Sequence, residues 1–126
     1  MLYNKDKEEI MALINTATKK DFEDKVLHNN KVVLVDFWAD WCAPCHAMTP
    51  VLKSIADKHG DDIDIVKVNI EESDENRQLA GAHQVQSIPN MVIFKDGQEI
   101  DRVIGVIRGS ELAKRLGTHA HFDVSE

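Results

Sequence analysis

Apolar residues recur along the chain with two different periods. Residues 31–37 form a largely apolar run rich in β-branched side chains, which is typical of a strand buried on both faces. Residues 63–70 form a second run that predicts a strand. Between the two runs, residues 44–59 predict an amphipathic helix, because apolar side chains recur three and four positions apart. Its apolar positions are Met48, Val51, Leu52, Ile55 and Ala56.

The rest of the chain continues this alternation of strands and helices. Thr18 is a candidate N-cap, Asp96-Gly97 predicts a type I′ hairpin turn, and Ser110 and Gly117 are expected to begin and end the last helix. Further elements are predicted at residues 4–13 (helix), 12–17 (short strand), 18–28 (helix), 74–83 (helix), 91–95 and 98–104 (paired strands) and 110–116 (helix). This order predicts an α/β fold in which helices cover both faces of the sheet.

The length of 126 residues predicts a single domain, 1–126, that is large enough to bury a core of its own. We expect the core to span about 12–117, preceded by an N-terminal extension, 1–11, and followed by a flexible tail, 118–126.

Charge and hydropathy exclude several classes of partner. With 15 basic and 22 acidic residues the net charge is −7, which argues against binding to nucleic acid and to acidic lipid surfaces. The longest apolar run, residues 32–35, is too short to span a membrane. Residues 1–9 are polar and precede no apolar leader segment, so we expect a cytoplasmic protein.

The only two cysteines, Cys42 and Cys45, follow the first buried strand and open the amphipathic helix. Unpaired N–H groups and the dipole at a helix N-terminus favour an anion there, and the thiolate is the reactive form of cysteine. Pro44 fits this first turn, where its missing N–H costs nothing. The spacing therefore predicts thiol–disulfide exchange, in which Cys42 attacks a partner's disulfide and the more buried Cys45 resolves the mixed disulfide.

Three other interpretations of the cysteine pair compete with this one. A zinc site needs about four ligands, and the scattered histidines supply no second pair at the usual spacing. Cys42 to His46 also matches the attachment pattern of c-type haem, but that pattern is short and requires export. The third interpretation is a pair of inert, buried cysteines.

Two further residues stand out against the apolar pattern. Asp36 interrupts the first buried strand, where burial should raise its pKa and make it a candidate proton acceptor for the resolving thiol. The alternative is a strand-end aspartate that accepts hydrogen bonds from backbone. Pro89 precedes the strand at 91–95 and predicts a strand entrance or a tight turn, because proline cannot donate within a central strand.

Residues 35–45, Val-Asp-Phe-Trp-Ala-Asp-Trp-Cys-Ala-Pro-Cys, resemble the thioredoxin family. The resemblance extends over roughly 12–116, and its further landmarks are Pro50, Lys67, Ile88-Pro89, Asp96-Gly97 and Gly105. It implies a thioredoxin fold, a central mixed β-sheet with helices on both faces, to which this chain adds the short N-terminal helix.

The resemblance also implies a role for each matching residue. Cys42 would be the nucleophile and Cys45 the resolving thiol, Asp36 with Lys67 would assist proton transfer, and Pro89 would be a cis-proline facing the disulfide. The backbone of Ile88 would pair with the substrate chain as an added strand. The apolar docking surface would consist of Trp41, Ala43, Pro44, Ile88, Gly105 and Val106.

The chain departs from the family pattern near the expected site. Ala43 replaces a glycine, His46 a basic residue and Asn90 a threonine, and His83-Gln84 replaces an aromatic-glycine pair. About three extra residues lie near 71–75. These differences bear on the range of partners and on the redox potential, and none of them touches the core chemistry.

The resemblance implies a general protein-disulfide reductase that acts as a monomer. Its partners would be a flavin-dependent thioredoxin reductase and disulfide-containing target proteins, and no bound cofactor would be needed besides the redox-active Cys42–Cys45 pair. Two alternatives remain open. One is a specialised oxidoreductase of the same fold, which has one dedicated partner or acts as an oxidant or isomerase. The other is a protein-binding module whose redox activity is incidental.

Overall fold

The computed structural model describes residues 13–124 and contains one five-stranded sheet in the order β1-β3-β2-β4-β5. The central strand β2 pairs in parallel with β3, which pairs in parallel with β1, whereas β4 and β5 run antiparallel. The strands are β1 (Leu13–Thr16), β2 (Val32–Trp38), β3 (Ile63–Asn69), β4 (Asn90–Lys95) and β5 (Gln98–Ile104). The helices are α2 (Lys19–Phe22), the π-helical turn η1 (Glu23–Leu27), α3 (Ala43–His59), α4 (Asp74–Ala82) and α5 (Gly109–Ala120).

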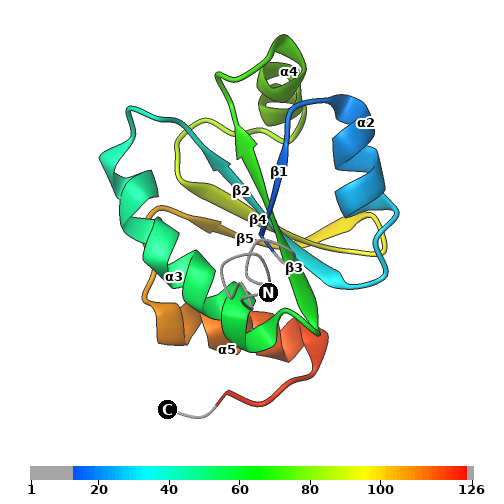
Figure 1. The fold of residues 1–126 in the computed structure, drawn as a ribbon, viewed down its shortest axis with the longest axis vertical. Coiled ribbons are helices and arrows are strands. Elements are labelled where there is room, and N and C mark those ends of the chain that lie inside the picture. The colour runs from blue at the N-terminus through cyan, green and yellow to red at the C-terminus, as the bar shows by residue number, and fades with distance from the viewer. Residues whose placement is uncertain (1–12, 125–126) are drawn as a thin grey trace, which may run out of the picture.

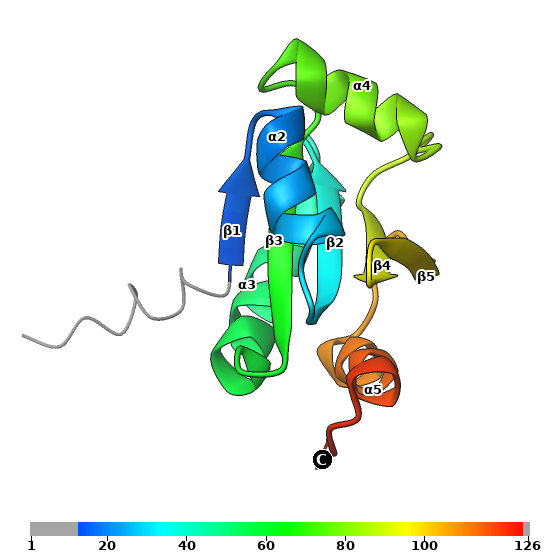
Figure 2. The same cartoon turned by 90° about the vertical axis from the view of Figure 1, so that its right-hand side faces the viewer.

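The helices cover the two faces of the sheet and create two apolar layers (Figures 1 and 2). Side chains of α3 and α5 pack on one face together with alternate residues of β2, such as Val32 and Leu34. Side chains of α2, η1 and α4 pack on the other face with Val33, Val35 and Phe37. The predicted mixed α/β sheet with helices on both faces is therefore confirmed. The expected N-terminal helix lies outside the described residues.

Local signals in the sequence account for several element boundaries. The hydroxyl of Thr18 accepts a hydrogen bond from the Asp21 amide at 3.0 Å, which confirms the predicted N-cap. At the hairpin, Asp96 and Gly97 both have positive φ, 52° and 79°, as a type I′ turn requires. A Cβ at Gly97 would also lie 3.0 Å from the carbonyl oxygen of Leu27. Both the positive φ and this close contact therefore favour glycine at position 97.

The predicted start and end of the last helix are wrong. The N-cap of α5 is Arg108, so Ser110 lies inside the helix, and α5 continues through Gly117 to Ala120. Gly117 does not stop the helix; it allows a close approach, because a Cβ there would lie 2.6 Å from the carbonyl oxygen of Phe122.

The start of the predicted flexible tail is therefore wrong as well. Nε2 of His119 lies 3.1 Å from a carboxylate oxygen of Asp101 on β5, which holds the last turn of α5 against the sheet. Phe122 then stacks on His59 of α3, with 4.1 Å between the ring centroids, and Val124 packs against the core.

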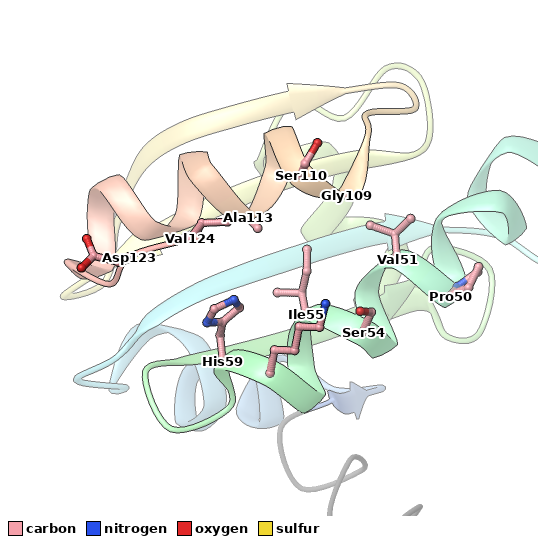
Figure 3. A pocket seen from close by; sticks show the side chains of 11 residues that line it. Pro50, Val51, Ser54, Ile55, His59, Gly109, Ser110, Ala113, Asp123 and Val124 are labelled. Carbon is pink, nitrogen blue, oxygen red and sulfur yellow. The ribbon is translucent and has the colours of Figure 1, made fainter. Parts of the chain in front are cut away.

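A groove of about 700 Å³ separates α3 from α5 (Figure 3). Val51, Ile55 and Ala113 form apolar parts of its lining, and Lys58 and Asp123 add charge. None of the residues that line this groove belongs to the predicted site. The cysteine pair lies apart from this groove, at the N-terminus of α3.

Candidate active site

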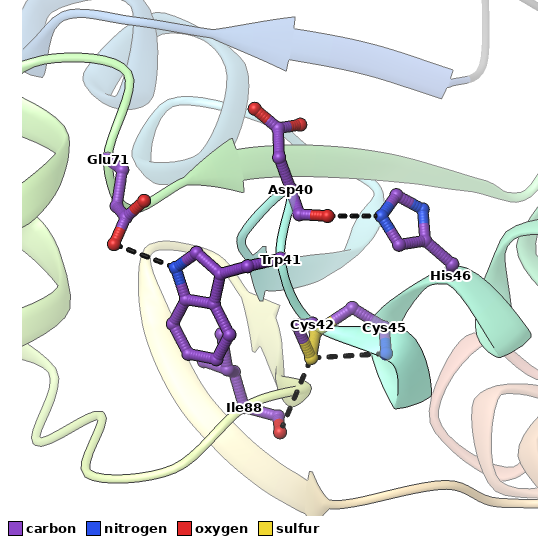
Figure 4. Close-up of a disulfide and its surroundings, with 7 residues drawn as sticks. All are labelled: Asp40, Trp41, Cys42, Cys45, His46, Glu71 and Ile88. Carbon is purple, nitrogen blue, oxygen red and sulfur yellow. Dashed lines mark hydrogen bonds between the residues drawn. A yellow bond between two sulfur atoms is a disulfide. The ribbon is translucent and has the colours of Figure 1, made fainter.

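Cys42 and Cys45 form a disulfide at the N-terminus of α3, with 5.3 Å between their Cα atoms (Figure 4). The chain leaves β2 at Trp38 and enters α3 with Cys42 as the N-cap. The backbone amide of Cys45 donates to Sγ of Cys42 at 3.2 Å. A helix amide that already points at the sulfur favours a thiolate at this position once the disulfide is reduced.

One expectation about the pair is wrong. Cys45 is not the more buried cysteine, since each residue is only 3% exposed. What distinguishes them is their place in the helix: Cys42 precedes the first turn, whereas Cys45 lies within it. Only Cys42 therefore has its sulfur at the capping position.

The Ile88–Pro89 segment lies against the disulfide. The peptide bond between these two residues is cis, as the resemblance implies. The carbonyl oxygen of Ile88 lies 3.8 Å from Sγ of Cys42, and the carbonyl of Pro89 accepts from the Gly105 amide at 2.8 Å. The structure thus brings together residues of the α3 N-terminus, the segment before β4 and the end of β5.

Exposed apolar side chains surround this junction. Trp41 is 65% exposed and Val106 61%, while Ala43 and Pro44 are exposed and Ile88 is partly exposed. The predicted docking residues thus come from three separate segments that meet at the disulfide.

Hydrogen bonds fix the loop that carries Trp41. The indole Nε1 of Trp41 donates to the carboxylate of Glu71 at 2.8 Å (Figure 4). On the other side of the loop, Nε2 of His46 lies 2.7 Å from the carbonyl oxygen of Asp40, so the ring donates to it from the first turn of α3. Trp41 is therefore an exposed but oriented side chain.

Asp36 and Lys67 are opposite each other on β2 and β3, on the face that α3 covers. Asp36 is 1% exposed, and its Oδ1 has no hydrogen-bond partner among the described residues. Burial raises the pKa of this carboxyl from 3.8 to about 6, although the positive charge of Lys67 lowers it. The Nζ atom of Lys67 lies 4.4 Å from the centroid of the Trp38 ring.

Sequence reasoning missed two residues of this surface. Ile104 is 62% exposed next to Gly105, and Glu71 orients Trp41. Strand alternation offered a signal for Ile104, because Val103 faces the core and its neighbour must face outward. The contact between Glu71 and Trp41 joins residues 30 positions apart and has no local signal.

Residues 13–124 contain no group of three or more histidine, cysteine or acidic side chains arranged to hold a metal ion. Within the same residues, every helix is too short or too polar to cross a membrane.

A sheet that places a disulfide at a helix N-terminus, opposite a cis-proline, defines a thiol–disulfide oxidoreductase. The profile of the family described as Thioredoxin matches residues 13–118. The chain is 41% identical over 109 residues to thioredoxin 1 of Synechococcus elongatus, covering 86% of this chain and 99% of that protein. A thioredoxin of Staphylococcus aureus shows the same identity and coverage.

Solved structures agree with these sequence matches. A mutant thioredoxin from Halobacterium salinarum superposes with a TM-score of 0.78 at 30% identity, covering 89% of this chain and 94% of that chain. The thioredoxin of Malassezia sympodialis gives 0.75 at 34% identity, covering 86% and 90%. The chain belongs to the thioredoxin family, and Cys42–Cys45 is its redox-active disulfide.

Proposed function

We propose that this thioredoxin is a general protein-disulfide reductase in which Cys42 attacks and Cys45 resolves. The thiolate of Cys42 attacks one sulfur of a target disulfide, and the other target sulfur leaves as a thiolate. The thiolate of Cys45 then attacks Sγ of Cys42 in the mixed disulfide and expels the second target sulfur. The target gains two electrons, and the Cys42–Cys45 disulfide holds the matching oxidation. The helix amide directed at Sγ of Cys42 is the observation that carries this assignment.

We further propose that Asp36 accepts the proton of Cys45. A carboxyl whose pKa burial raises to about 6 can both take and release a proton near neutral pH. Asp36 lies on the face of β2 that α3 covers, which is the helix that begins beside the two sulfurs. Lys67, opposite it on β3, supplies a positive charge that favours the carboxylate.

Target proteins would dock as an extended strand beside the Ile88–Pro89 segment. The apolar surface formed by Trp41, Ala43, Pro44, Ile88, Gly105 and Val106 supports this role, because it surrounds buried sulfurs that a target must reach. Backbone pairing would give affinity for many sequences, which suits a general reductase rather than one with a single partner.

The partners that this function implies are a flavin-dependent thioredoxin reductase, which returns the disulfide to the dithiol, and disulfide-containing proteins. We place the cycle in the cytoplasm, where reductants keep protein thiols reduced. The protein would act as a monomer, and the cysteine pair would be its only redox group.

The decisive experiment is reduction of insulin by dithiothreitol with and without catalytic amounts of the protein. We expect acceleration by the wild type and none by Cys42→Ser. Cys45→Ser should instead accumulate a mixed disulfide with the target, because the attack survives and the resolving thiol is lost. A wild-type rate equal to that of dithiothreitol alone would refute the proposal, and would favour a dedicated partner or a binding role that survives loss of both cysteines.

A further inference from the structure

Arg102 on β5 holds both ends of the segment that carries Ile88 and Pro89. Its Nη2 donates to the carbonyl oxygen of His83 at 2.7 Å, where the segment begins. Its Nη1 donates to Oδ1 of Asn90 at 3.2 Å, directly after Pro89. Two points seven residues apart in the chain are thus joined through one guanidinium group.

The guanidinium is itself held in place. The carboxylate of Glu99 accepts from Nε at 3.1 Å and from Nη2 at 2.7 Å, so the ion pair is bidentate. The Arg102 side chain is only 17% exposed, so water screens these contacts less than it screens most surface ion pairs. A rigid donor group that faces two acceptors can restrain both.

Both acceptors belong to residues that the fold packs firmly. The side chain of Asn90 is buried on the face of the sheet that Arg102 shares. The ring of His83 packs among Phe22, Phe37 and Phe94, while its backbone carbonyl accepts from Arg102. Two packed residues are thus linked through a single arginine.

We propose that Arg102 is a positioning residue that holds residues 84–89 in the conformation to which a protein substrate binds. This inference rests on the proposed function, because it requires the Ile88 backbone to receive the substrate strand. Arg102 touches neither sulfur, so the exchange reaction itself does not need it. The Gly105 amide holds Pro89 independently, at 2.8 Å, and the amides of Gln84 and Val85 donate to carbonyls of α4. Ile88 packs against the core, and Arg102 adds the polar restraint that joins the two ends of the segment.

Loss of Arg102 should therefore weaken binding of proteins more than it slows chemistry. A segment freed at His83 and Asn90 samples more conformations, and a target strand must then order it on binding. A small disulfide that reaches the sulfurs without pairing to the Ile88 backbone does not require that ordering. The two substrate types separate a positioning role from general damage to the site.

The test compares Arg102→Gln with Arg77→Gln, a matched change in charge at an exposed ion pair with Asp74 on α4. We expect Arg102→Gln to raise KM for insulin by roughly fivefold with kcat within about twofold, as loss of charge-assisted hydrogen bonds that order the segment would do. Its rate with the small disulfide 5,5′-dithiobis(2-nitrobenzoic acid) should match that of Arg77→Gln. Amide hydrogen exchange at Ile88 should be faster in Arg102→Gln alone.

Arg102→Lys keeps the charge but loses the planar fork, so we expect an intermediate KM for insulin. If Arg102→Gln does not fold, Arg102→Lys takes its place in the comparison with Arg77→Gln. Equal insulin KM and equal Ile88 exchange in the variants of Arg102 and Arg77 would overturn the inference. If the wild type failed to reduce insulin, the proposed function would fall, whereas hydrogen exchange would still decide whether Arg102 restrains the segment.

Discussion

Asp36 is a residue whose acid–base behaviour the fold changes strongly. It lies on the central strand, with Lys67 of β3 on one side and Met91 of β4 on the other. Burial raises its pKa to about 6, and the charge of Lys67 offsets only part of that effect. A stability cost and a kinetic role should both follow from this one shift, and each can be measured separately.

The stability cost has a definite sign. Because the folded-state pKa lies above the unfolded value of 3.8, the native protein binds this proton more tightly, and stability falls as pH rises from about 4 through about 6. The ionised carboxylate should then cost on the order of 3 kcal/mol at pH 7.5. Asp36→Asn cannot ionise, so we expect it to raise the free energy of unfolding at pH 7.5 by about 1–3 kcal/mol.

Urea titration at pH 7.5 and at pH 4 checks this. The gain should disappear at pH 4, where the carboxyl of the wild type is protonated in the folded state. Asp40→Asn, a matched change on the exposed loop before the cysteines, should leave stability unaltered. A gain of equal size at both pH values would show that packing at position 36, and not the charge of the carboxylate, lowers the stability of the wild type.

The kinetic role of Asp36 concerns the second half of the exchange. If its carboxylate accepts the proton of Cys45, Asp36→Asn should slow release of the target from the mixed disulfide on the order of tenfold or more near pH 7. The first attack, by the thiolate of Cys42, should keep its rate. Rapid-mixing kinetics with a fluorescent peptide disulfide resolves the two steps. Identical release rates in the variant and the wild type would remove Asp36 from the mechanism.

At the scale of elements, the segment after α4 contains a backbone strain that the sequence explains. Gln84 has a φ of 58°, in the left-handed region that glycine adopts most readily. Side chains with a Cβ adopt this conformation at a cost of about 1 kcal/mol. We therefore expect Gln84→Gly to stabilise the protein by about 0.5 kcal/mol, because the added entropy of the unfolded glycine offsets part of the gain.

Gln86 supplies the control for this substitution. It lies two residues further along the same exposed segment and is not among the residues with positive φ. Gln86→Gly should destabilise the protein, since only the entropic term applies to it. Thermal unfolding of both variants under identical conditions would show opposite shifts; shifts of the same sign would mean that Gln84 is not strained.

The elements themselves were predictable to different degrees, for physical reasons. The strands β2 and β3 and the helix α3 follow from periodicity, which is a local property of the chain. The end of α5 does not, because contacts from His119 to Asp101 and from Phe122 to His59 extend it beyond Gly117. A glycine that admits a neighbouring carbonyl and a glycine that ends a helix look the same in sequence.

The candidate site shows the same division. The cysteine pair and Asp36 were evident because each interrupts or follows a local pattern. Glu71 and Arg102 were not evident, because their partners are distant in the sequence. Arg102 contacts Asn90 and His83, 12 and 19 positions away, and Glu71 contacts Trp41, 30 positions away. Long polar side chains can reach many neighbours, and only the fold selects among them.

At the scale of the whole molecule, strand direction explains why the site forms where it does. The parallel strands β2 and β3 end at the same edge of the sheet, and their extensions carry the cysteine pair and Glu71. The antiparallel strand β4 begins at that edge, directly after Pro89, and β5 ends there at Ile104. Four chain segments therefore converge on the disulfide.

Because the fold brings the two cysteines together, the disulfide form of the protein should be more stable to unfolding than the dithiol form. The disulfide links residues three positions apart, and closing so short a loop in the unfolded chain costs about 2 kcal/mol in conformational entropy. In the folded protein the start of α3 places the two Cα atoms 5.3 Å apart, so most of that cost is absent. We expect the free energy of unfolding to be about 2 kcal/mol larger for the disulfide than for the dithiol form.

Because the redox and folding equilibria form a closed cycle, the same difference must lower the midpoint potential of the folded protein relative to its unfolded chain. About 2 kcal/mol corresponds to roughly 40 mV for a two-electron couple. Guanidinium titrations of both forms give one side of the cycle, and glutathione equilibration with and without denaturant gives the other. Equal unfolding free energies for the two forms would mean that folding does not favour the disulfide, and the fold would then contribute nothing to the reducing power that the proposed function requires.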